Sequence, residues 1–280
     1  MLLDIGQFKD KKTGIENFVK LIKCKISRLP KGKDKMQLMI DNDPHENKNV
    51  WYLDTDENEI YKNKLLLRVK KEKGNGKFDL TLKCRNPDRY VAASYDLQPQ
   101  KKPFITHSEF EFGENIVPRF SSIYYTPSKC KVEKNYDFQS VEALVSIFPG
   151  LKDLNISKEN GLRKVNRFEA LETKKEIGRV FFPNLNNFIE MSLDLWYLPN
   201  GDKESGIPII AEFAFDYKSK TFESLSKDND PVEKPTHLEE FSLSLVNFAN
   251  SFFYSLQEDE SMNSNQKVKT KSEFVYEYNR

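Results

Sequence analysis

Alternating hydrophobic and polar residues dominate the chain and predict strands. In Ser108-Glu109-Phe110-Glu111-Phe112 the alternation is strict, as expected where one face of a strand is buried and the other is polar. Other segments qualify through runs of β-branched and aromatic residues. The expected strands are residues 18–26, 49–53, 65–71, 78–85, 108–112, 162–171, 188–198 and 209–217, with a late edge strand at 274–276.

A second pattern, with apolar residues three and four positions apart, predicts helices. Residues 236–257 carry such a stripe behind the capping box formed by Thr236 and Glu239. Residues 140–148 predict a short helix that Pro149-Gly150 ends, and residues 86–106 a loop. Near the start of the chain, Thr13 and Glu16 would also suit a helix cap. The β-branched and apolar content of 18–26 nevertheless favours a strand there.

Together these elements predict an α+β fold of strands flanked by helices, and closure of the strands into a β-barrel would place one set of strand faces inside it. We expect one domain over residues 1–258, followed by a polar linker and the terminal strand within 259–280. A closed barrel also removes the exposed edges of a sheet.

Composition narrows the classes of partner. Of 280 residues, 44 are basic and 43 acidic, a net charge of +1, so no global field attracts DNA or an anionic membrane. No run reaches the ~18 apolar residues of a membrane helix. Three widely spaced cysteines give no disulfide framework or zinc finger. We expect a cytoplasmic protein with no DNA or membrane partner. RNA binding through Lys20, Lys23 and Lys25 is weakly indicated, and the oligomeric state is open.

Charged residues share strand faces in several segments. On some of the predicted strands the polar face carries cations, namely Arg68, Lys70, Lys83, Arg163 and Arg167. On others it carries carboxylates, namely Glu109, Glu111, Glu212 and Asp216. Solvated strands give the same pattern, but inside a barrel these charges would line the lumen. Arginine and lysine neutralise phosphate oxygens, and carboxylates hold Mg²⁺ or Mn²⁺. Such a lumen would suit hydrolysis of a polyanion.

The order of these motifs resembles that of the CYTH superfamily, the triphosphate tunnel metalloenzymes. The resemblance begins with Tyr52-Leu53-Asp54-Thr55, continues through the segments containing Arg68, Lys83 and Glu109, and ends near residue 217. It implies an eight-stranded antiparallel tunnel that binds triphosphate compounds. Members hydrolyse thiamine triphosphate, tripolyphosphate or RNA 5′-triphosphates, and others cyclise ATP.

Roles for individual residues follow from the same resemblance. Substrate phosphates would be bound by Lys25, Arg68, Lys70, Lys83, Arg163 and Arg167. The metal, Mg²⁺ or Mn²⁺, would be held by Glu109, Glu111, Asp194 and Glu212. Glu212 and Glu111 would be the catalytic carboxylates.

The chain departs from the family pattern at its first strand. Family members open with an ExExK strand, whereas Leu21-Ile22-Lys23-Cys24-Lys25 keeps only the final lysine, and Ala214 stands where a second glutamate is usual. Two functions therefore remain: metal-dependent hydrolysis of a triphosphate, or binding of a triphosphate or other phosphoryl ligand without turnover. An unrelated barrel with solvated strand faces is the third alternative. Nothing in the sequence identifies the substrate.

Overall fold

The fold was analysed in a computed structural model. It describes residues 1–29, 36–41, 46–72, 76–134, 136–182, 187–200, 203–204, 206–219, 243–259 and 270–278. These residues divide into two compact units. Unit 1 comprises Met1–Glu46, Thr173–Trp196 and Gly206–Asn265, and unit 2 comprises Asn47–Glu172, Tyr197–Ser205 and Gln266–Arg280.

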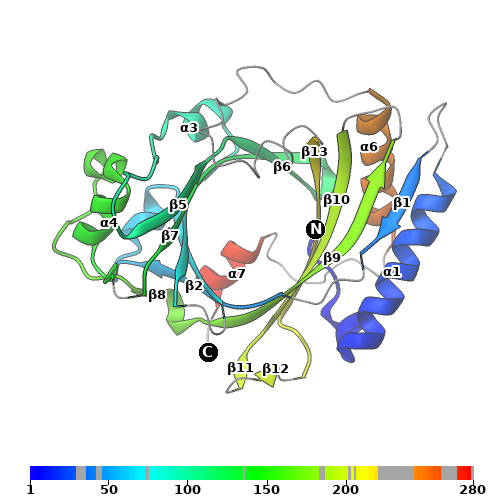
Figure 1. The fold of residues 1–280 in the computed structure, drawn as a ribbon, viewed down its shortest axis with the longest axis horizontal. Coiled ribbons are helices and arrows are strands. Elements are labelled where there is room, and N and C mark those ends of the chain that lie inside the picture. The colour runs from blue at the N-terminus through cyan, green and yellow to red at the C-terminus, as the bar shows by residue number, and fades with distance from the viewer. Residues whose placement is uncertain are drawn as a thin grey trace. The chain divides into compact units, whose positions relative to one another are not determined.

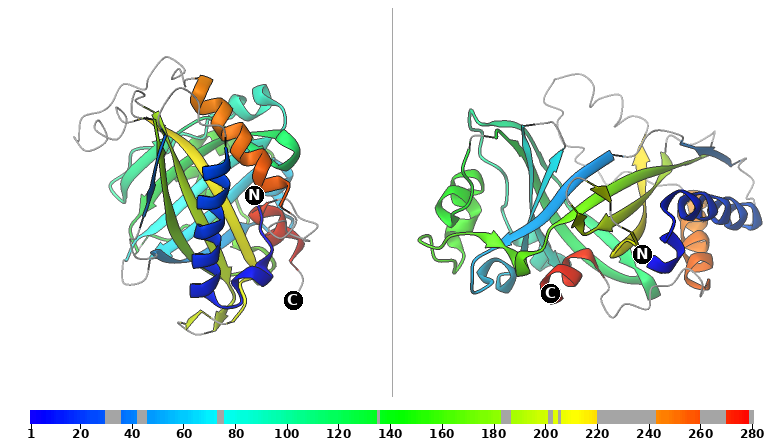
Figure 2. Two further views of the ribbon diagram at one scale, coloured as in Figure 1. Left: turned by 90° about the vertical axis from the view of Figure 1, so that its right-hand side faces the viewer. Right: turned by 90° about the horizontal axis from the view of Figure 1, so that it is seen from below.

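Unit 1 is an open antiparallel sheet with two helices on its apolar face. Strand β10 (Asn187–Tyr197) pairs with β13 (Ile210–Ser219), and β1 (Gln37–Ile40) pairs with β9 (Ala170–Phe181), whose first three residues belong to unit 2. Helices α1 (Lys11–Arg28) and α6 (Leu243–Gln257) lie along this sheet (Figure 1) and close to each other (Figure 2). The short helix η1 (Ile5–Phe8) precedes α1.

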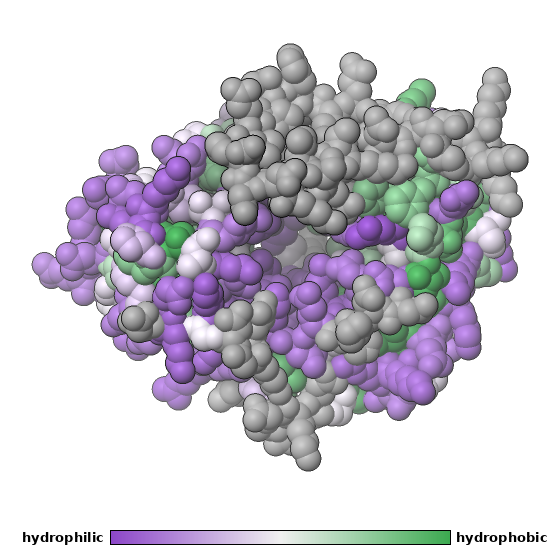
Figure 3. Space-filling model, viewed as in Figure 1, coloured by the Kyte–Doolittle hydropathy of each residue, from purple (hydrophilic) through white to green (hydrophobic). Residues whose placement is uncertain are grey.

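Aromatic rings join the helices of unit 1 to the sheet. The ring of Phe213 on β13 lies 5.3 Å from that of Phe18 on α1 and 6.2 Å from that of Phe252 on α6, both edge to face. Each fully buried phenylalanine contributes roughly 1.5–3 kcal/mol relative to exposure. Figure 3 shows that hydrophobic surface remains over α6, where Leu243 and Tyr254 are exposed.

Helix α1 replaces the strand predicted at 18–26, and that prediction is wrong. Phe18, Ile22 and Ile26 are all buried, and their spacing of four residues places them on one side of a helix. The Asp10 carboxylate accepts a hydrogen bond from the Thr13 N–H (2.7 Å) and caps the first turn. The helical alternative indicated by Thr13 and Glu16 is the one that forms.

Unit 2 contains antiparallel strands in the order β2-β3-β4-β7-β5. Strand β6 pairs with β7, as β5 does, and β8 pairs with β2. The bounds are β2 (Glu46–Asp54), β3 (Leu65–Glu72), β4 (Phe78–Asn86), β5 (Ile105–Phe110), β6 (Gly113–Val117), β7 (Ser121–Val132) and β8 (Arg163–Lys164). A small hairpin, β11 (Pro199–Asn200) with β12 (Lys203–Glu204), also belongs to this unit.

The helices of unit 2 are short. They are α2 (Glu59–Lys62), α3 (Arg89–Ser94), η2 (Pro118–Phe120), α4 (Val141–Ile147), η3 (Pro149–Asp153), η4 (Val165–Arg167) and α7 (Lys271–Glu277). Leu67 and Leu82 of the sheet join one core with Leu144 and Phe148 from the α4 segment. Cys84 and Cys130, also in this core, are free thiols.

The predicted α+β class, with antiparallel strands and flanking helices, is confirmed, whereas the strands of neither unit close on themselves. The strands predicted at 49–53, 65–71, 78–85, 188–198 and 209–217 are confirmed, as is the helix at 140–148, whereas the strand predicted at 108–112 begins earlier and ends at Phe110. The helix predicted at 236–257 is confirmed from Leu243, and its capping box lies outside the described residues. None of the described helices is long and apolar enough to cross a membrane.

Three further predictions require correction. Residues 274–276 form part of helix α7, because Thr270 caps a helical turn at Glu273. The loop predicted at 86–106 contains helix α3, which Asp88 caps. The strand predicted at 162–171 is divided into β8, η4 and the start of β9, because Asn166 and Arg167 take positive φ angles of 50° and 53°.

Candidate functional site

One face of the unit 2 sheet is apolar and the other is charged. Leu67 and Val69 of β3 and Leu80 and Leu82 of β4 are fully buried in the core. The side chains between them therefore project from the opposite face, because successive residues of a strand alternate. We call this opposite surface the cationic face and define it by Arg68, Lys70, Asp79, Thr81, Lys83, Lys129 and Lys131.

Strand register arranges the cationic face in two adjacent rows. In the first row Lys70 pairs with Asp79, which pairs with Lys131. In the second row Arg68 pairs with Thr81, which pairs with Lys129, and Lys129 pairs in turn with Glu109 of β5. Since neighbouring strands lie ~4.8 Å apart, each row is a short track of closely spaced polar groups.

Arg68 has a hydrogen-bond donor that no described residue uses. Its Nη2 lies 3.4 Å from the Thr81 hydroxyl oxygen. Its Nε atom is buried and has no hydrogen-bond partner among the described residues. A buried polar group without a partner is costly, so this donor suits an acceptor supplied by a ligand. The planar guanidinium matches phosphate oxygens well.

Beside Arg68, the buried carboxylate of Glu172 holds two lysines. Glu172, 1% exposed, forms an ion pair with Lys70, and Lys271 of α7 lies 3.9 Å from it. Burial alone would raise the pKa of Glu172, but the charges of Lys70, Lys271 and Arg68 outweigh it and lower that pKa. The carboxylate is therefore ionised and fixes the position of the Lys70 ammonium group.

Lys83 lies on an aromatic ring at the end of the cationic face. Its Nζ is 3.7 Å from the centre of the Tyr125 ring, a cation–π contact. Arg85, two residues further along β4, donates to the Ser272 hydroxyl (2.9 Å), and its Nε is buried without a partner among the described residues. Sequence reasoning placed Lys83 here but did not single out Arg85.

The predicted metal ligands Glu109 and Glu111 meet a lysine in the structure. The Lys129 ammonium lies 3.1 Å from a Glu109 oxygen and 3.6 Å from a Glu111 oxygen. His107 Nε2 is 2.8 Å from the other Glu109 oxygen. Burial tends to raise the pKa of Glu109, but His107 and Lys129 lower it. These carboxylates are thus neutralised by side chains of the protein itself.

Arg163 and Arg167, predicted to bind phosphate, belong to β8 and η4 and not to the strands that carry the cationic face. Both are exposed, and Arg163 forms an ion pair with Asp56. Arg167 lies in η4, where the backbone leaves the strand conformation. The break in the strand is the physical reason that these two arginines do not share the single strand face that the sequence predicted.

Lys25, predicted on the opening strand, lies on helix α1 in unit 1. Its ammonium group donates to the Ser255 carbonyl oxygen (2.8 Å) and forms an ion pair with Asp259 (3.0 Å). Ser255 lies within α6 and Asp259 lies just after it, so Lys25 joins the two helices of unit 1. This placement favours a structural role over phosphate binding.

The other predicted acidic residues, Asp194 and Glu212, also belong to unit 1. They are direct neighbours in the β10–β13 register, as are Glu190 and Asp216. Nearby, Arg179 binds Glu190 through Nη2 at 2.8 Å. Within the residues that the structure describes, no group of three or more His, Cys, Asp or Glu side chains is arranged to hold a metal ion.

Asp54 and Thr55, from the Tyr52-Leu53-Asp54-Thr55 motif, stabilise the backbone through hydrogen bonds. The Asp54 carboxylate accepts N–H groups of Thr55 (2.7 Å), Ile60 (2.9 Å) and Tyr61 (3.0 Å), and the Tyr276 hydroxyl (2.8 Å). The Thr55 hydroxyl accepts the Glu59 N–H (3.0 Å). Together they fix the turn after β2.

Sequence reasoning missed Glu172, Lys129 and Lys131. The signal for the lysines was the alternation Ser128-Lys129-Cys130-Lys131-Val132, which lies after Pro127 in a strand that was not predicted. Glu172 stands in Ala170-Leu171-Glu172-Thr173, where no alternation distinguishes it. Its role can be recognised only from the structure, in which Glu172 of β9 is ion-paired with Lys70 of β3.

Comparisons with known proteins give a distant likeness of fold. Neither a protein-family model nor a curated protein matches the sequence. A similar solved structure is a candidate adenylyl cyclase from Hippeastrum with a dominant triphosphatase activity; the TM-score is 0.37 and the identity 9%, over 75% of this chain and 79% of that one. Another is a candidate adenylate cyclase from Bacillus halodurans, with TM-score 0.29 and 14% identity over 72% and 94%.

Proposed function

We propose that the protein binds linear triphosphate compounds on the cationic face of unit 2. The observation that carries the proposal is Arg68, whose buried Nε has no partner, beside a Lys70 that Glu172 holds in place. Lys83 and Lys129 extend the same surface. A chain of phosphates presents several charged oxygens in a line, which a row of cations on adjacent strands can contact at once.

Binding is favoured over chemistry by the state of the carboxylates on this face. Each of the three carboxylates Glu109, Glu111 and Glu172 has a lysine partner. Their negative charges are therefore compensated by these lysines. Several weak charged contacts acting together would give affinity that rises with the number of phosphates. Salt should weaken it, because exposed charges are screened.

The test is calorimetric titration of the full chain with orthophosphate, pyrophosphate and tripolyphosphate in EDTA. We expect tripolyphosphate to bind most tightly and Arg68→Ala to weaken it by at least tenfold. Arg167→Ala removes an exposed arginine outside the cationic face and is the matched control. Equal affinity for the three anions, or equal loss in both variants, would contradict the proposal.

Metal-dependent hydrolysis of a triphosphate compound is the second candidate, and one observation favours it. In unit 1 Asp194 and Glu212 stand opposite each other on paired strands. Two carboxylates on paired strands can share one divalent cation, because Mg²⁺ and Mn²⁺ prefer hard oxygen ligands. The substrate would be tripolyphosphate, thiamine triphosphate or a nucleoside triphosphate, with Mg²⁺ or Mn²⁺.

Phosphate release separates the two functions. Wild type and Glu212→Gln are compared with Mg²⁺, Mn²⁺ and EDTA, after circular dichroism shows that both are folded. Turnover that needs the metal and disappears in Glu212→Gln would establish hydrolysis. Binding of tripolyphosphate without turnover in any metal would establish the binding function alone.

A further inference from the structure

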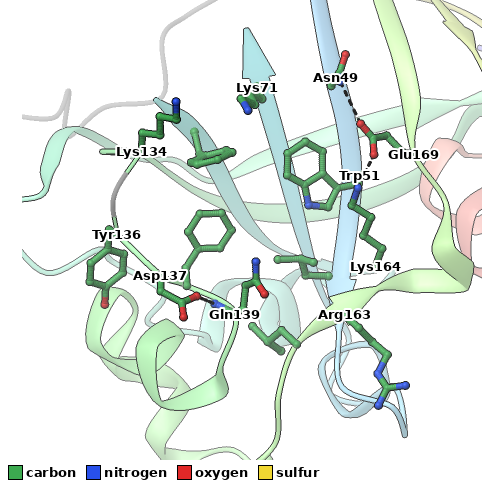
Figure 4. Close-up of a pocket in the computed structure, with 14 residues that line it drawn as sticks. Asn49, Trp51, Lys71, Lys134, Tyr136, Asp137, Gln139, Arg163, Lys164 and Glu169 are labelled. Atoms are coloured by element: carbon green, nitrogen blue, oxygen red, sulfur yellow. Dashed lines mark hydrogen bonds and ion pairs between the residues drawn. The ribbon is translucent and has the colours of Figure 1, made fainter. Parts of the chain in front are cut away.

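Unit 2 contains a pocket on the apolar side of its sheet, lined by the side chains that alternate with the cationic face. Trp51 of β2 and Phe78 of β4 line it, together with Phe138 from the segment before α4. The cavity has a volume of ≈ 720 Å³, within the usual range for small-molecule sites. Figure 4 shows Trp51 in the middle of the pocket, between Lys164 and the strand that carries Lys71.

Aromatic rings form the floor of this pocket. The rings of Trp51 and Phe78 are 6.2 Å apart, and those of Phe78 and Phe138 are 5.2 Å apart, in both cases edge to face. Phe78 is half-buried, so part of its ring is open to the pocket. Such a floor is suited to stack or pack against a planar apolar group.

Charged side chains form the rim, and some of them already have partners. Lys164 is ion-paired with Glu169, and its ammonium lies 5.0 Å from the centre of the Trp51 ring. Glu169 also accepts a hydrogen bond from the Asn49 amide (3.0 Å). Arg163, paired with Asp56, points away from the other labelled residues in Figure 4.

Two lysines on the rim differ from these. Lys71 contacts the Phe78 ring at 5.4 Å, and neither Lys71 nor Lys134 has a carboxylate partner among the described residues. Figure 4 shows them on the same side of the pocket, with the aromatic side chains below. Their ammonium groups are thus available to an anion that enters with an apolar ring.

From this arrangement we infer that the pocket binds a small molecule combining an aromatic ring with an anionic group. The ring packs on Trp51, Phe78 and Phe138, and Lys71 and Lys134 hold the phosphate or carboxylate. This site uses none of the residues that define the cationic face. It would therefore be occupied independently of a triphosphate.

The probes are AMP and phenyl phosphate, titrated into the full chain first without tripolyphosphate and then in its presence. Adenosine supplies a ring without an anion, and ribose 5-phosphate an anion without an aromatic ring. We expect both aromatic phosphates to bind and each partial ligand to bind at least tenfold more weakly. Quenching of Trp51 fluorescence in a Trp196→Phe background provides a local readout.

The decisive variant is Lys71→Ala combined with Lys134→Ala, which should weaken AMP by about tenfold. Lys62→Ala with Lys101→Ala removes two exposed lysines that do not line the pocket and is the control. Absence of binding by both aromatic phosphates, or equal affinity in the two double variants, would overturn the inference. Failure of tripolyphosphate alone to bind would instead contradict only the proposed function, because the Lys71 and Lys134 comparison needs no triphosphate.

Discussion

Glu172 is buried and is ion-paired with Lys70 of the cationic face. Its pKa is lowered because Lys70, Lys271 and Arg68 outweigh the effect of burial. An acidic group whose pKa is lower in the folded state stabilises the fold fully above its ordinary pKa. That contribution is lost as the pH falls through the folded value.

The first prediction is that Glu172→Gln destabilises the protein by about 3 kcal/mol at pH 7, because it leaves buried cations without their counter-charge. The difference in unfolding free energy between wild type and variant should shrink as the pH falls from 6 to 3. Urea denaturation at several pH values measures it. A difference that grows on acidification would show that Glu172 is not held ionised.

The second prediction concerns Lys129 and Glu109, and the two variants should act in opposite directions. Lys129→Met removes a cation from the proposed phosphate site and should weaken tripolyphosphate binding several-fold. Glu109→Gln removes an anion and should strengthen it by a few-fold, because the pair is largely exposed. Calorimetry in EDTA measures both. If Glu109→Gln weakened binding instead, the carboxylate would have a direct part in holding the ligand.

A third prediction follows from the four hydrogen bonds that Asp54 accepts. Asp54→Asn turns one acceptor into a donor that faces N–H groups, and we expect a loss of about 2–4 kcal/mol in unfolding free energy. Tyr276→Phe removes a single hydrogen bond and should cost about 1 kcal/mol. Thermal and urea unfolding would distinguish them. Equal effects would mean that the backbone hydrogen bonds contribute little.

The fourth prediction uses Gly178 of β9, which has a φ of 148°. An added Cβ would lie 2.1 Å from the Met39 carbonyl oxygen of β1. Gly178→Ala should therefore destabilise unit 1 by roughly 2 kcal/mol or more, through strain and the loss of β1 pairing. Gly161→Ala is the matched control, since only the Gln139 carbonyl, at 3.9 Å, is near its Cβ position. Similar unfolding of the two variants would contradict the reasoning.

Alternation identified the strands that bear Arg68, Lys70 and Lys83 because each has one face in a continuous core. It failed where other interactions decide the backbone. Phe18, Ile22 and Ile26 are compatible with either conformation, and the Asp10 cap together with packing on Phe213 selects the helix. Strand β7 was missed because it contains Pro127, which normally argues against a strand.

Pro127 is accommodated by an interruption in its neighbours. Strand β5 ends opposite Ser128 and β6 begins opposite Tyr125, so Pro127 lies where neither is paired with β7. Local sequence contains no sign of this arrangement, which depends on two other segments. The lysines that follow Pro127 were missed for the same reason.

The first residues of unit 1 lie against β13 as an added extended segment. The Leu3 N–H donates to the Ala211 carbonyl (2.8 Å), and the Phe213 N–H donates to the Met1 carbonyl (2.9 Å). An uncovered edge strand exposes backbone groups on which a second molecule can add its own strand. Three residues that satisfy these groups therefore protect this part of β13 against edge-to-edge aggregation.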